Sequence, residues 1–368
     1  MPPSPPFQIE RHVHPDTLPE AARQLLAQAE SETGYLELGL DWWRNLVDQV
    51  YAGEPGLAFY LLRRGEQVLA ILPMRCATSG WQRQHSSLSN YYSAIYAPIL
   101  HADAGAAELA QLLRALRRAH GGASLRFAPM DPQSRSYAAL LQALRQAGLR
   151  PFEYFCFGNW FRACSGSWDE YLQQRPGPVR STIKRAGKKF SAAGGTLELV
   201  TGGAHLEQKL AAYTQVYGAS WKVPEPYPGF VPGLARYCAE RGWLRLGIAW
   251  LNGQPVAAQL WIVAHGRANI YKLAYDEAYK AYASGTLLTA MLMQHVLEQD
   301  GVREVDYLIG DDPYKKAWMD QRRERWGIVA YNPASPAGLL GLLRERAGRA
   351  LRRLRPLKPQ PDAAAPQD

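Results

Sequence analysis

The start of one predicted helix, Ser284-Gly285-Thr286, has the clearest chemical potential in the sequence. Residues 269–275 before it have the composition of a strand, and apolar residues recur at helical spacing over 287–296. The first N–H groups of a helix have no partner within it and lie at the positive end of its dipole. Because Gly285 has no side chain, a phosphate group can approach the backbone there. The segment therefore predicts an anion site; the alternative is a structural helix that Ser284 caps.

Basic residues gather on one side of a second predicted helix, 178–193. They are Arg180, Lys184, Arg185, Lys188 and Lys189. Side chains four positions apart share a helix face, so these charges should lie together. The basic face predicts contact with a phosphate-bearing partner, and the alternative is that the charges are simply solvated.

The formal charge of +9 is unevenly distributed along the chain. Residues 344–358 carry seven Arg or Lys against Glu345 alone, a net +6, which leaves +3 for the rest. Charge alone therefore does not mark the main body as a nucleic-acid binder. Residues 338–355 predict a basic amphipathic helix that binds an anionic membrane surface or a partner protein; the alternative is that its leucines pack on the body. The tail beyond it is predicted to be disordered.

Length and composition restrict the class of protein. A chain of 368 residues favours two domains, and 47% hydrophobic residues supply ample material for buried cores. The four cysteines have no metal-ligand spacing, and the sequence shows neither an export signal nor an apolar run long enough to cross a bilayer. We therefore expect no metal site and a cytoplasmic protein. Nucleophile-elbow, P-loop and zinc-protease motifs are also missing, so an enzyme nucleophile is not expected.

The predicted elements repeat one order in both halves of the chain: hairpin, helix, strand, helix and strand. The first half contains a hairpin over 57–74, and the second contains one over 244–275 that turns at Asn252-Gly253. This repetition predicts an α/β (α+β) fold of two tandem lobes, each with a mixed, mostly antiparallel sheet flanked by helices. The cleft between the lobes is the expected place for a substrate.

The lobes are predicted over residues 1–160 and 161–335, and the basic helix with its tail over 336–368. A polar and aromatic stretch in the first lobe, residues 84–97, either lines the substrate cleft or forms a half-buried loop.

Five motifs in the second half stand out together: Gly253–Ala258, Lys272–Asp276, Ser284–Leu288, Val305–Tyr307 and Gly310–Lys315. With them, the run from residue 242 to residue 318 resembles the GNAT-superfamily acyltransferases of the CelD/BcsL type, which are relatives of the FemAB/FemX aminoacyltransferases. The resemblance implies tandem GNAT-like lobes, as in FemX-type proteins. It also implies an N-acyltransferase that uses an acyl-CoA as co-substrate and holds no permanent cofactor.

The resemblance also implies where the acyl donor binds. In GNAT enzymes the strand corresponding to residues 269–275 holds the thioester carbonyl through a backbone N–H, and the next helix start holds the pyrophosphate of coenzyme A. Ser284, Gly285 and Thr286 take this second role here. The sequence departs from the family at the usual Q/R-x-x-G-x-G/A loop, which residues 281–286 replace.

Acyl transfer to an amine needs a base for the amine and an acid for the leaving group. By resemblance, Tyr314 protonates the leaving thiolate and Lys315 meets a phosphate; the alternatives are that Tyr314 packs and that Lys315 is solvated. Asp276 and Asp311, each at the end of a predicted strand, are the candidates for the base. Either aspartate could instead cap a turn or a helix.

Six residues are predicted to bind substrate: Arg180, Lys184, Trp221, Lys222, Lys272 and Tyr275. Trp221 and Lys222 match the family's recurring Ser-Trp-Lys, although Trp221 could instead fill the core. The partners implied are a small acyl donor and an amine acceptor, such as an amino sugar of polysaccharide production.

Two other functions stay open. One is a FemX-like transferase that takes an aminoacyl group from charged tRNA, which the basic helix would suit electrostatically. The other is a non-catalytic accessory protein of envelope polysaccharide synthesis, attached through the helix over 338–355. In either case the expected location is cytoplasmic, peripheral to the inner face of the membrane.

Overall fold

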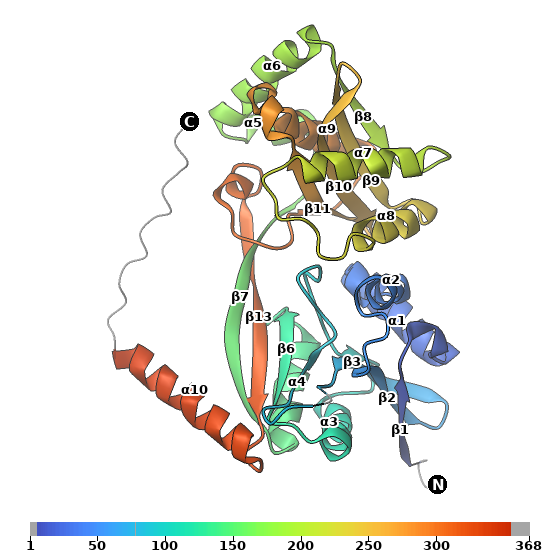
Figure 1. The fold of residues 1–368 in the computed structure, drawn as a ribbon, viewed down its shortest axis with the longest axis vertical. Helices are drawn as coiled ribbons and strands as arrows, with labels where there is room; N and C mark the ends of the chain where they lie inside the picture. Colours follow the sequence, from blue (N-terminus) through green and yellow to red (C-terminus); the bar gives the residue numbers. More distant parts are fainter. Residues whose placement is uncertain (1–5, 78, 355–368) are drawn as a thin grey trace.

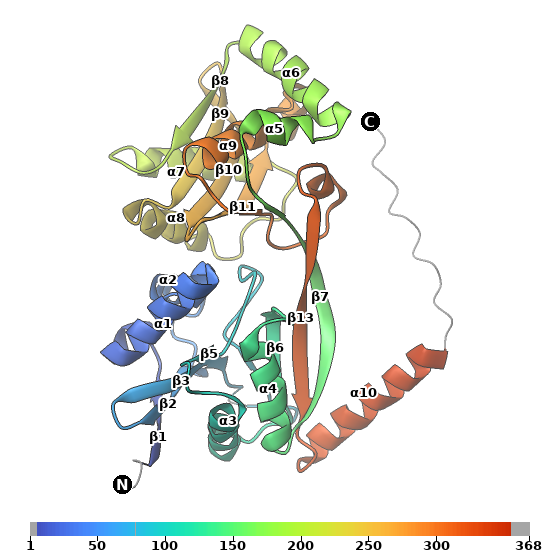
Figure 2. The ribbon, with the colours of Figure 1, turned by 180° about the vertical axis from the view of Figure 1, so that it is seen from behind.

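Two lobes lie one above the other in the computed structural model (Figure 1, Figure 2). The structure describes residues 6–77 and 79–354. The elements of the first lobe are β1 (Phe7–His12), α1 (Glu20–Thr33), α2 (Leu40–Val50), β2 (Leu57–Arg64), β3 (Gln67–Arg75), β4 (Gln84–Ser87), β5 (Ile99–Leu100), α3 (Ala106–His120), β6 (Ser124–Met130) and α4 (Arg135–Gln146), with short 3-10 turns η1 (Pro15–Thr17) and η2 (Leu36–Leu38).

The second lobe follows a long strand, β7 (Arg150–Ala163). Its elements are α5 (Trp168–Gln173), α6 (Gly177–Ala192), β8 (Gly195–Val200), α7 (Leu206–Gly218), α8 (Phe230–Glu240), β9 (Leu244–Leu251), β10 (Gln254–Ala264), β11 (Arg267–Tyr275), η3 (Glu277–Tyr282), α9 (Ser284–Glu298), β12 (Glu304–Asp306) and η4 (Pro313–Ala317). The chain then returns through β13 (Gln321–Tyr331) and ends in α10 (Pro336–Leu354).

The strands of both lobes join into one sheet. In the described part of the chain thirteen strands are ordered β1-β2-β3-β4-β6-β13-β7-β12-β11-β10-β9-β8, with β5 beside β3. A parallel pair occupies the corresponding place in each lobe, β4 with β6 and β11 with β12, while the neighbouring pairs are antiparallel. The predicted fold class, tandem lobes with mostly antiparallel sheets flanked by helices, is confirmed.

The long strands β7 and β13 connect the two lobes. They pair with each other from Arg150 to Phe161 of β7, along all of β13, and run along one side of the molecule (Figure 1). β13 pairs with β6 of the first lobe, and the end of β7 pairs with β12 of the second. The boundary predicted at residue 160 therefore lies inside β7, and the division of the chain at 160 and 335 stays a prediction.

The segment after β12 is less regular than the sequence suggests. The apolar run after Val305 stays in the strand β12 only as far as Asp306, and the chain from Pro313 forms only the short turn η4. The cause lies in side chains that replace strand pairing: Asp306 accepts a hydrogen bond from the Leu308 N–H (2.7 Å), and Asn159 donates one to the Leu308 carbonyl (2.8 Å). Leu308 adopts the left-handed conformation, with φ of 54°, so regular pairing with β7 is interrupted here and resumes only as a single bridge between Gly310 and Asn159.

The buried face predicted for the helix after Ser284 is present in α9, where Leu288, Leu292 and Val296 are fully buried. The predicted N-cap is wrong. Ala283, with φ of 50°, precedes the helix, and Ser284 is its first residue. The left-handed turn at Ala283 lets its carbonyl accept the N–H groups of Thr286 and Leu287, which leaves no place for a cap by the Ser284 hydroxyl.

The helix α10 extends outward from the end of β13 (Figure 1, Figure 2). Ala337 and Leu342 are buried against the body, whereas Leu339, Leu343 and Leu351 are exposed. The helix therefore packs through one side near its start and presents an apolar stripe on another. The predicted disordered tail and the last basic residues lie outside the described residues. Among the described helices, none combines the length and the apolar character required to cross a membrane.

Candidate active site

A cavity of about 320 Å3 opens where the parallel strands β11 and β12 separate. The two strands pair over Arg267–Asn269 and Glu304–Asp306, after which β12 ends and β11 continues to Tyr275. One wall is the β11 segment 270–273, and the opposite wall is the turn 307–309 with η4. Trp221 and Lys222 close the cavity from the loop after α7, and residues 91–92 reach it from the first lobe. The cavity therefore lies between the lobes, where the sequence predicts a substrate.

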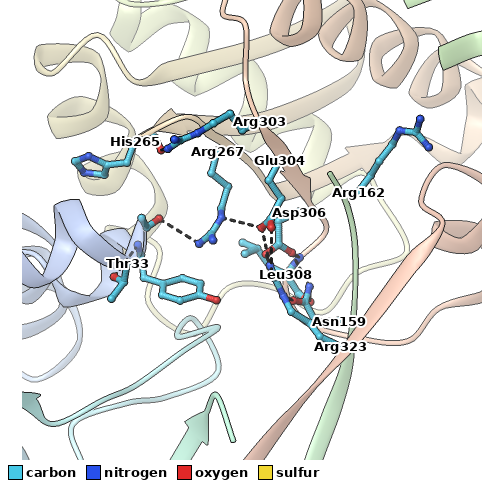
Figure 3. Close-up of polar contacts among 12 residues, drawn as sticks. Thr33, Asn159, Arg162, His265, Arg267, Arg303, Glu304, Asp306, Leu308 and Arg323 are labelled. Carbon is cyan, nitrogen blue, oxygen red and sulfur yellow. Dashed lines mark hydrogen bonds and ion pairs between the residues drawn. The ribbon is translucent and has the colours of Figure 1, made fainter. Parts of the chain in front are cut away.

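A buried ionic network holds the turn that forms one wall (Figure 3). Asp306 has no solvent exposure, and its carboxylate is paired with Arg323 and accepts from Asn159 (2.5 Å). Burial opposes ionisation of Asp306, but Arg323 and these hydrogen bonds outweigh it and lower the pKa. Arg323 also pairs with Glu304 (2.8 Å), so β12, β7 and β13 are fixed together at the base of the cavity.

Tyr314 and Lys315 both line the cavity, from η4. Tyr314 is 46% exposed and lies edge-on to Tyr307, with ring centroids 5.8 Å apart. Desolvation and the Asp312 carboxylate raise the pKa of the Tyr314 phenol, so it keeps its proton at neutral pH. Lys315 is buried, and its ammonium donates to the carbonyls of Ile309 (2.6 Å) and Gly310 (3.4 Å) and pairs with Asp312 (3.0 Å). Lys315 is therefore built into the turn, which accounts for its burial without a phosphate.

Neither aspartate proposed as a base lines the cavity. The Asp276 carboxylate accepts from the Ala278 N–H (2.9 Å) and caps η3. Asp311 holds Arg322 through both of its oxygens (2.7 and 3.1 Å) and accepts from the Trp160 indole (2.6 Å). The hydrogen bonds from Arg322 are the main reason why the pKa of Asp311 is lowered. Both aspartates therefore occupy cap and turn positions, and we do not keep either as the base.

Lys222 has an unusual environment for a lysine. Its Nζ lies 5.6 Å from the ring centroid of Tyr217 and 5.7 Å from that of Trp221. Within residues 6–77 and 79–354 its ammonium makes no hydrogen bond or ion pair, and only its backbone N–H donates, to the Ser220 hydroxyl (3.4 Å). Burial, with a contribution from the nearby charge of Lys272, lowers the pKa of Lys222 to about 8. A substantial fraction of Lys222 is therefore neutral in mildly alkaline solution, as a proton acceptor must be.

Glu225 holds residues around the cavity together, and the sequence does not single it out. It forms an ion pair with Lys272 (2.7 Å) and accepts hydrogen bonds from Tyr91 and from Tyr92 (2.7 Å). Burial disfavours its charge, but these partners outweigh burial and lower its pKa. Glu225 thus fastens the loop after α7 to β11 and to the first lobe. Glu225 lies between two prolines and belongs to no motif. The two tyrosines that donate to it lie in the aromatic stretch 84–97, which the sequence did single out.

The start of α9 lies next to the cavity rather than in its lining. Trp221 is stacked at a tilt against Tyr275, with ring centroids 4.5 Å apart. A Cβ atom added to Gly285 would meet the Tyr275 ring at 3.6 Å. Ser284 is buried, while Gly285 and Thr286 are partly exposed, and Gln259 anchors the helix start by donating to the Gly285 carbonyl (2.8 Å). The residues predicted for the donor phosphates thus lie one aromatic ring away from the cavity.

The basic helix lies on the outside of the second lobe. Arg180 and Lys184 are exposed on α6 and do not line the cavity. Lys189, from the same helix, donates to the Ala281 carbonyl (3.1 Å) and so links α6 to the loop before α9. The face is therefore separate from the cavity but adjoins the segment that leads to Gly285.

Residues 178–316 match the family model described as an acetyltransferase (GNAT) domain. They contain the cavity walls, the loop after α7 and the start of α9, and the predicted enzyme class, an acyltransferase, is thereby confirmed. No curated protein matches the sequence of the whole chain.

Solved structures share the tandem architecture. A structure of FemX is 12% identical with a TM-score of 0.57, and the match covers 88% of this chain and 97% of that one. The C-terminal domain of a putative lysylphosphatidylglycerol synthetase from Agrobacterium fabrum is 15% identical with a TM-score of 0.50, covering 88% and 97%. L-PGS from Bacillus licheniformis is 14% identical with a TM-score of 0.50, covering 89% and 96%. Similarity at this level of identity establishes a common fold.

Proposed function

We propose that the protein is an N-acyltransferase that transfers an acyl group from an acyl-CoA to an amine acceptor in the cavity between β11 and β12. The observation that carries the proposal is that the start of α9 adjoins the cavity, with the contacting rings of Trp221 and Tyr275 between them. A donor whose acyl group lies in the cavity can extend its phosphates to the N–H groups at Gly285, where the helix dipole favours negative charge.

The residues of the cavity supply the groups that acyl transfer needs. A backbone N–H of β11 binds the thioester carbonyl and stabilises the oxyanion that forms when the amine attacks. Lys222, in its neutral form, takes the proton of the acceptor amine. Tyr314, whose raised pKa keeps its phenol protonated, gives a proton to the leaving thiolate. The C–N bond of the amide forms and the C–S bond of the thioester breaks, with no acyl-enzyme required.

The donor assignment is tested by ligand-induced stabilisation. Acetyl-CoA and coenzyme A should raise the melting temperature, since a ligand present at 100 times its Kd stabilises the native state by about 2.7 kcal/mol. Gly285→Asp should remove the shift because its carboxylate repels the pyrophosphate. A negative charge at a helix start does not destabilise the helix, so the loss reports on binding. Gly285→Ala is the matched control, since the space beside Tyr275 accepts a methyl group. No shift in the unaltered protein with either ligand contradicts the donor assignment.

A FemX-like reaction, with an aminoacyl group taken from charged tRNA, is the second candidate. The exposed basic face of α6 favours it, because such a face attracts a phosphate backbone in a salt-dependent manner. Tighter binding of aminoacyl-tRNA than of acetyl-CoA, lost in a Lys184→Glu, Lys188→Glu double variant, would select this candidate. Binding that the double variant retains would reject it.

For the acceptor we propose an amino sugar of the CelD/BcsL type of polysaccharide pathway. Aromatic side chains at the mouth of the cavity support it: Tyr91, Trp221 and Tyr314 are each about half exposed and offer flat apolar faces to a sugar ring. Acetyl transfer to glucosamine but not to a simple alkyl amine supports this acceptor, and the reverse preference rejects it. A complete lack of transfer, with donor binding also missing, would leave the non-catalytic accessory role.

We further propose that α10 brings this cytoplasmic enzyme to an anionic membrane surface. Exposed Leu339, Leu343 and Leu351 supply an apolar stripe, and Arg344 and Arg346 are exposed beside it. Basic residues near an anionic surface contribute on the order of 1 kcal/mol each.

A further inference from the structure

We propose that Lys222 is itself an acyl acceptor: when the amine substrate is absent, the bound acyl thioester acylates its Nζ, and the enzyme then carries an acyl-lysine in its own cavity. The inference rests on the proposed function, because it needs an acyl thioester between β11 and β12. It adds a modification site and a consequence for activity.

Lys222 is placed between the two walls of the cavity. The charged groups that act on its ammonium come from both sides: Lys272 on β11, and Asp312 and Lys315 beside the β12 turn, with Glu225 from its own loop. The side chain also lines the cavity itself. An acyl carbonyl held by the backbone of β11 would therefore share this cavity with the Lys222 nitrogen.

The three lysines that line the cavity differ in whether their nitrogen is free to react. Lys272 is paired with Glu225 (2.7 Å), and Lys315 is paired with Asp312 and bound by two carbonyls. By contrast, the ammonium of Lys222 forms no hydrogen bond or ion pair among the described residues and lies over the rings of Tyr217 and Trp221. A nucleophilic nitrogen needs a free lone pair, so the cavity itself singles out Lys222.

The protonation state of Lys222 agrees with this geometry. Near pH 8, about half of Lys222 is neutral, because burial lowers its pKa to about 8. For a solvated lysine with a pKa of about 10.4, the neutral fraction at that pH is about 100-fold smaller. A less basic amine is also intrinsically less nucleophilic, which offsets part of this advantage. We expect Lys222 to react with a bound thioester at least about 10-fold faster than a surface lysine.

The step balances without another reactant. The neutral Nζ attacks the thioester carbonyl, a C–N bond forms and the C–S bond breaks. Tyr314 gives its proton to the departing thiolate. The proton that the nitrogen loses then returns to Tyr314. The products are an Nζ-acyl lysine and coenzyme A with a free thiol. Because an amide nitrogen neither accepts a proton nor carries charge, acylation removes the base, and the enzyme switches itself off when donor is present without acceptor.

Peptide mass spectrometry of the full-length protein tests the inference. The protein is incubated with acetyl-CoA at pH 8 without an acceptor, and acetylation is followed at Lys222, Lys315 and Lys184. Lys315 is the control inside the cavity, and Lys184 is the control on the surface of α6. We expect Lys222 to gain one acetyl group at least about 10-fold faster than Lys184, and Lys315 to stay unmodified. Acetylation of Lys222 at the rate of Lys184 or slower overturns the inference.

A parallel reaction separates this failure from failure of the proposed function. Acetic anhydride acetylates free amines without binding as a donor, and coenzyme A reports donor binding through the melting temperature. If coenzyme A stabilises the protein and yet acetyl-CoA leaves Lys222 unmodified, the self-acylation inference alone is overturned. If coenzyme A has no effect and Lys222 reacts with the anhydride only, both the inference and the donor assignment fail. Lys222→Arg, which keeps the charge and cannot be acetylated, should lose the fast phase of acetyl incorporation, and a fast phase that persists also overturns the inference.

Discussion

The ion pair between Glu225 and Lys272 should be a measurable source of stability, because it joins the loop after α7 to β11 beside the cavity. The side chains of Lys272 and Glu225 are 14% and 12% exposed, and the atoms that join them are 2.7 Å apart. Removing one partner of a fully buried pair costs about 3–5 kcal/mol. The residual exposure and the carbonyl that glutamine keeps reduce this to about 2 kcal/mol for Glu225→Gln.

This loss is measured by calorimetry of the full-length protein. A domain of 150–250 residues loses about 2–4 °C per kcal/mol, so we expect the melting temperature to fall by about 4–8 °C. Glu207→Gln is the matched control. Glu207 forms an ion pair at the same distance, 2.7 Å, with Arg236, but this pair lies on the open surface. The substitution should therefore leave the melting temperature unchanged. Equal shifts in the two variants would refute the reasoning that shielding from water gives the Glu225 pair its strength.

Other consequences follow from the same structure. Tyr314→Phe should lower turnover by about 100-fold with little change in donor affinity, as measured by steady-state kinetics and titration, and unchanged turnover would make Tyr314 a packing residue. Burial raises the pKa of Glu37 to about 7. The stability that its protonated form contributes is complete below about pH 4.3 and is lost as the pH rises through 7, by at most about 4 kcal/mol. Urea unfolding of Glu37→Gln should show a weaker fall in stability from pH 5 to 8, and an identical slope would refute this expectation. The full-length protein should bind anionic vesicles at low salt, and Leu343→Asp should weaken this binding without changing the melting temperature; no vesicle binding by the unaltered protein contradicts the role of α10.

Local patterns in the sequence predicted individual helices and hairpins better than they predicted which distant strands pair. The hairpin at Asn252-Gly253 and the buried face of α9 follow from turn chemistry and helical periodicity, and both are present. The first half of β13, residues 321–325, is wholly charged or polar, so its composition does not predict a strand. That half is a strand because β7 supplies its hydrogen bonds and because Arg323 pairs with Glu304 and Asp306. A tertiary partner of this kind leaves no periodicity in the sequence.

Site residues that belong to a sequence motif could be predicted. Residues that belong to the site only through contacts with distant parts of the chain could not. Trp221, Lys222, Lys272, Tyr314 and Lys315 were expected from motifs, and the structure brings them together around one cavity. Asp276 and Asp311 were expected from their place at strand ends, but position along the chain does not tell which way a carboxylate points. Glu225 reaches the site through partners 47 to 134 residues away, a relation that only the folded chain reveals.

The most direct test of the account is a crystal structure of the full-length protein with coenzyme A. The account predicts the thiol in the cavity between β11 and β12, close to Tyr314, with the pantetheine arm passing Trp221 and Tyr275 and the pyrophosphate on the N–H groups at Gly285. Coenzyme A bound elsewhere, with the space between β11 and β12 left to solvent, would contradict it.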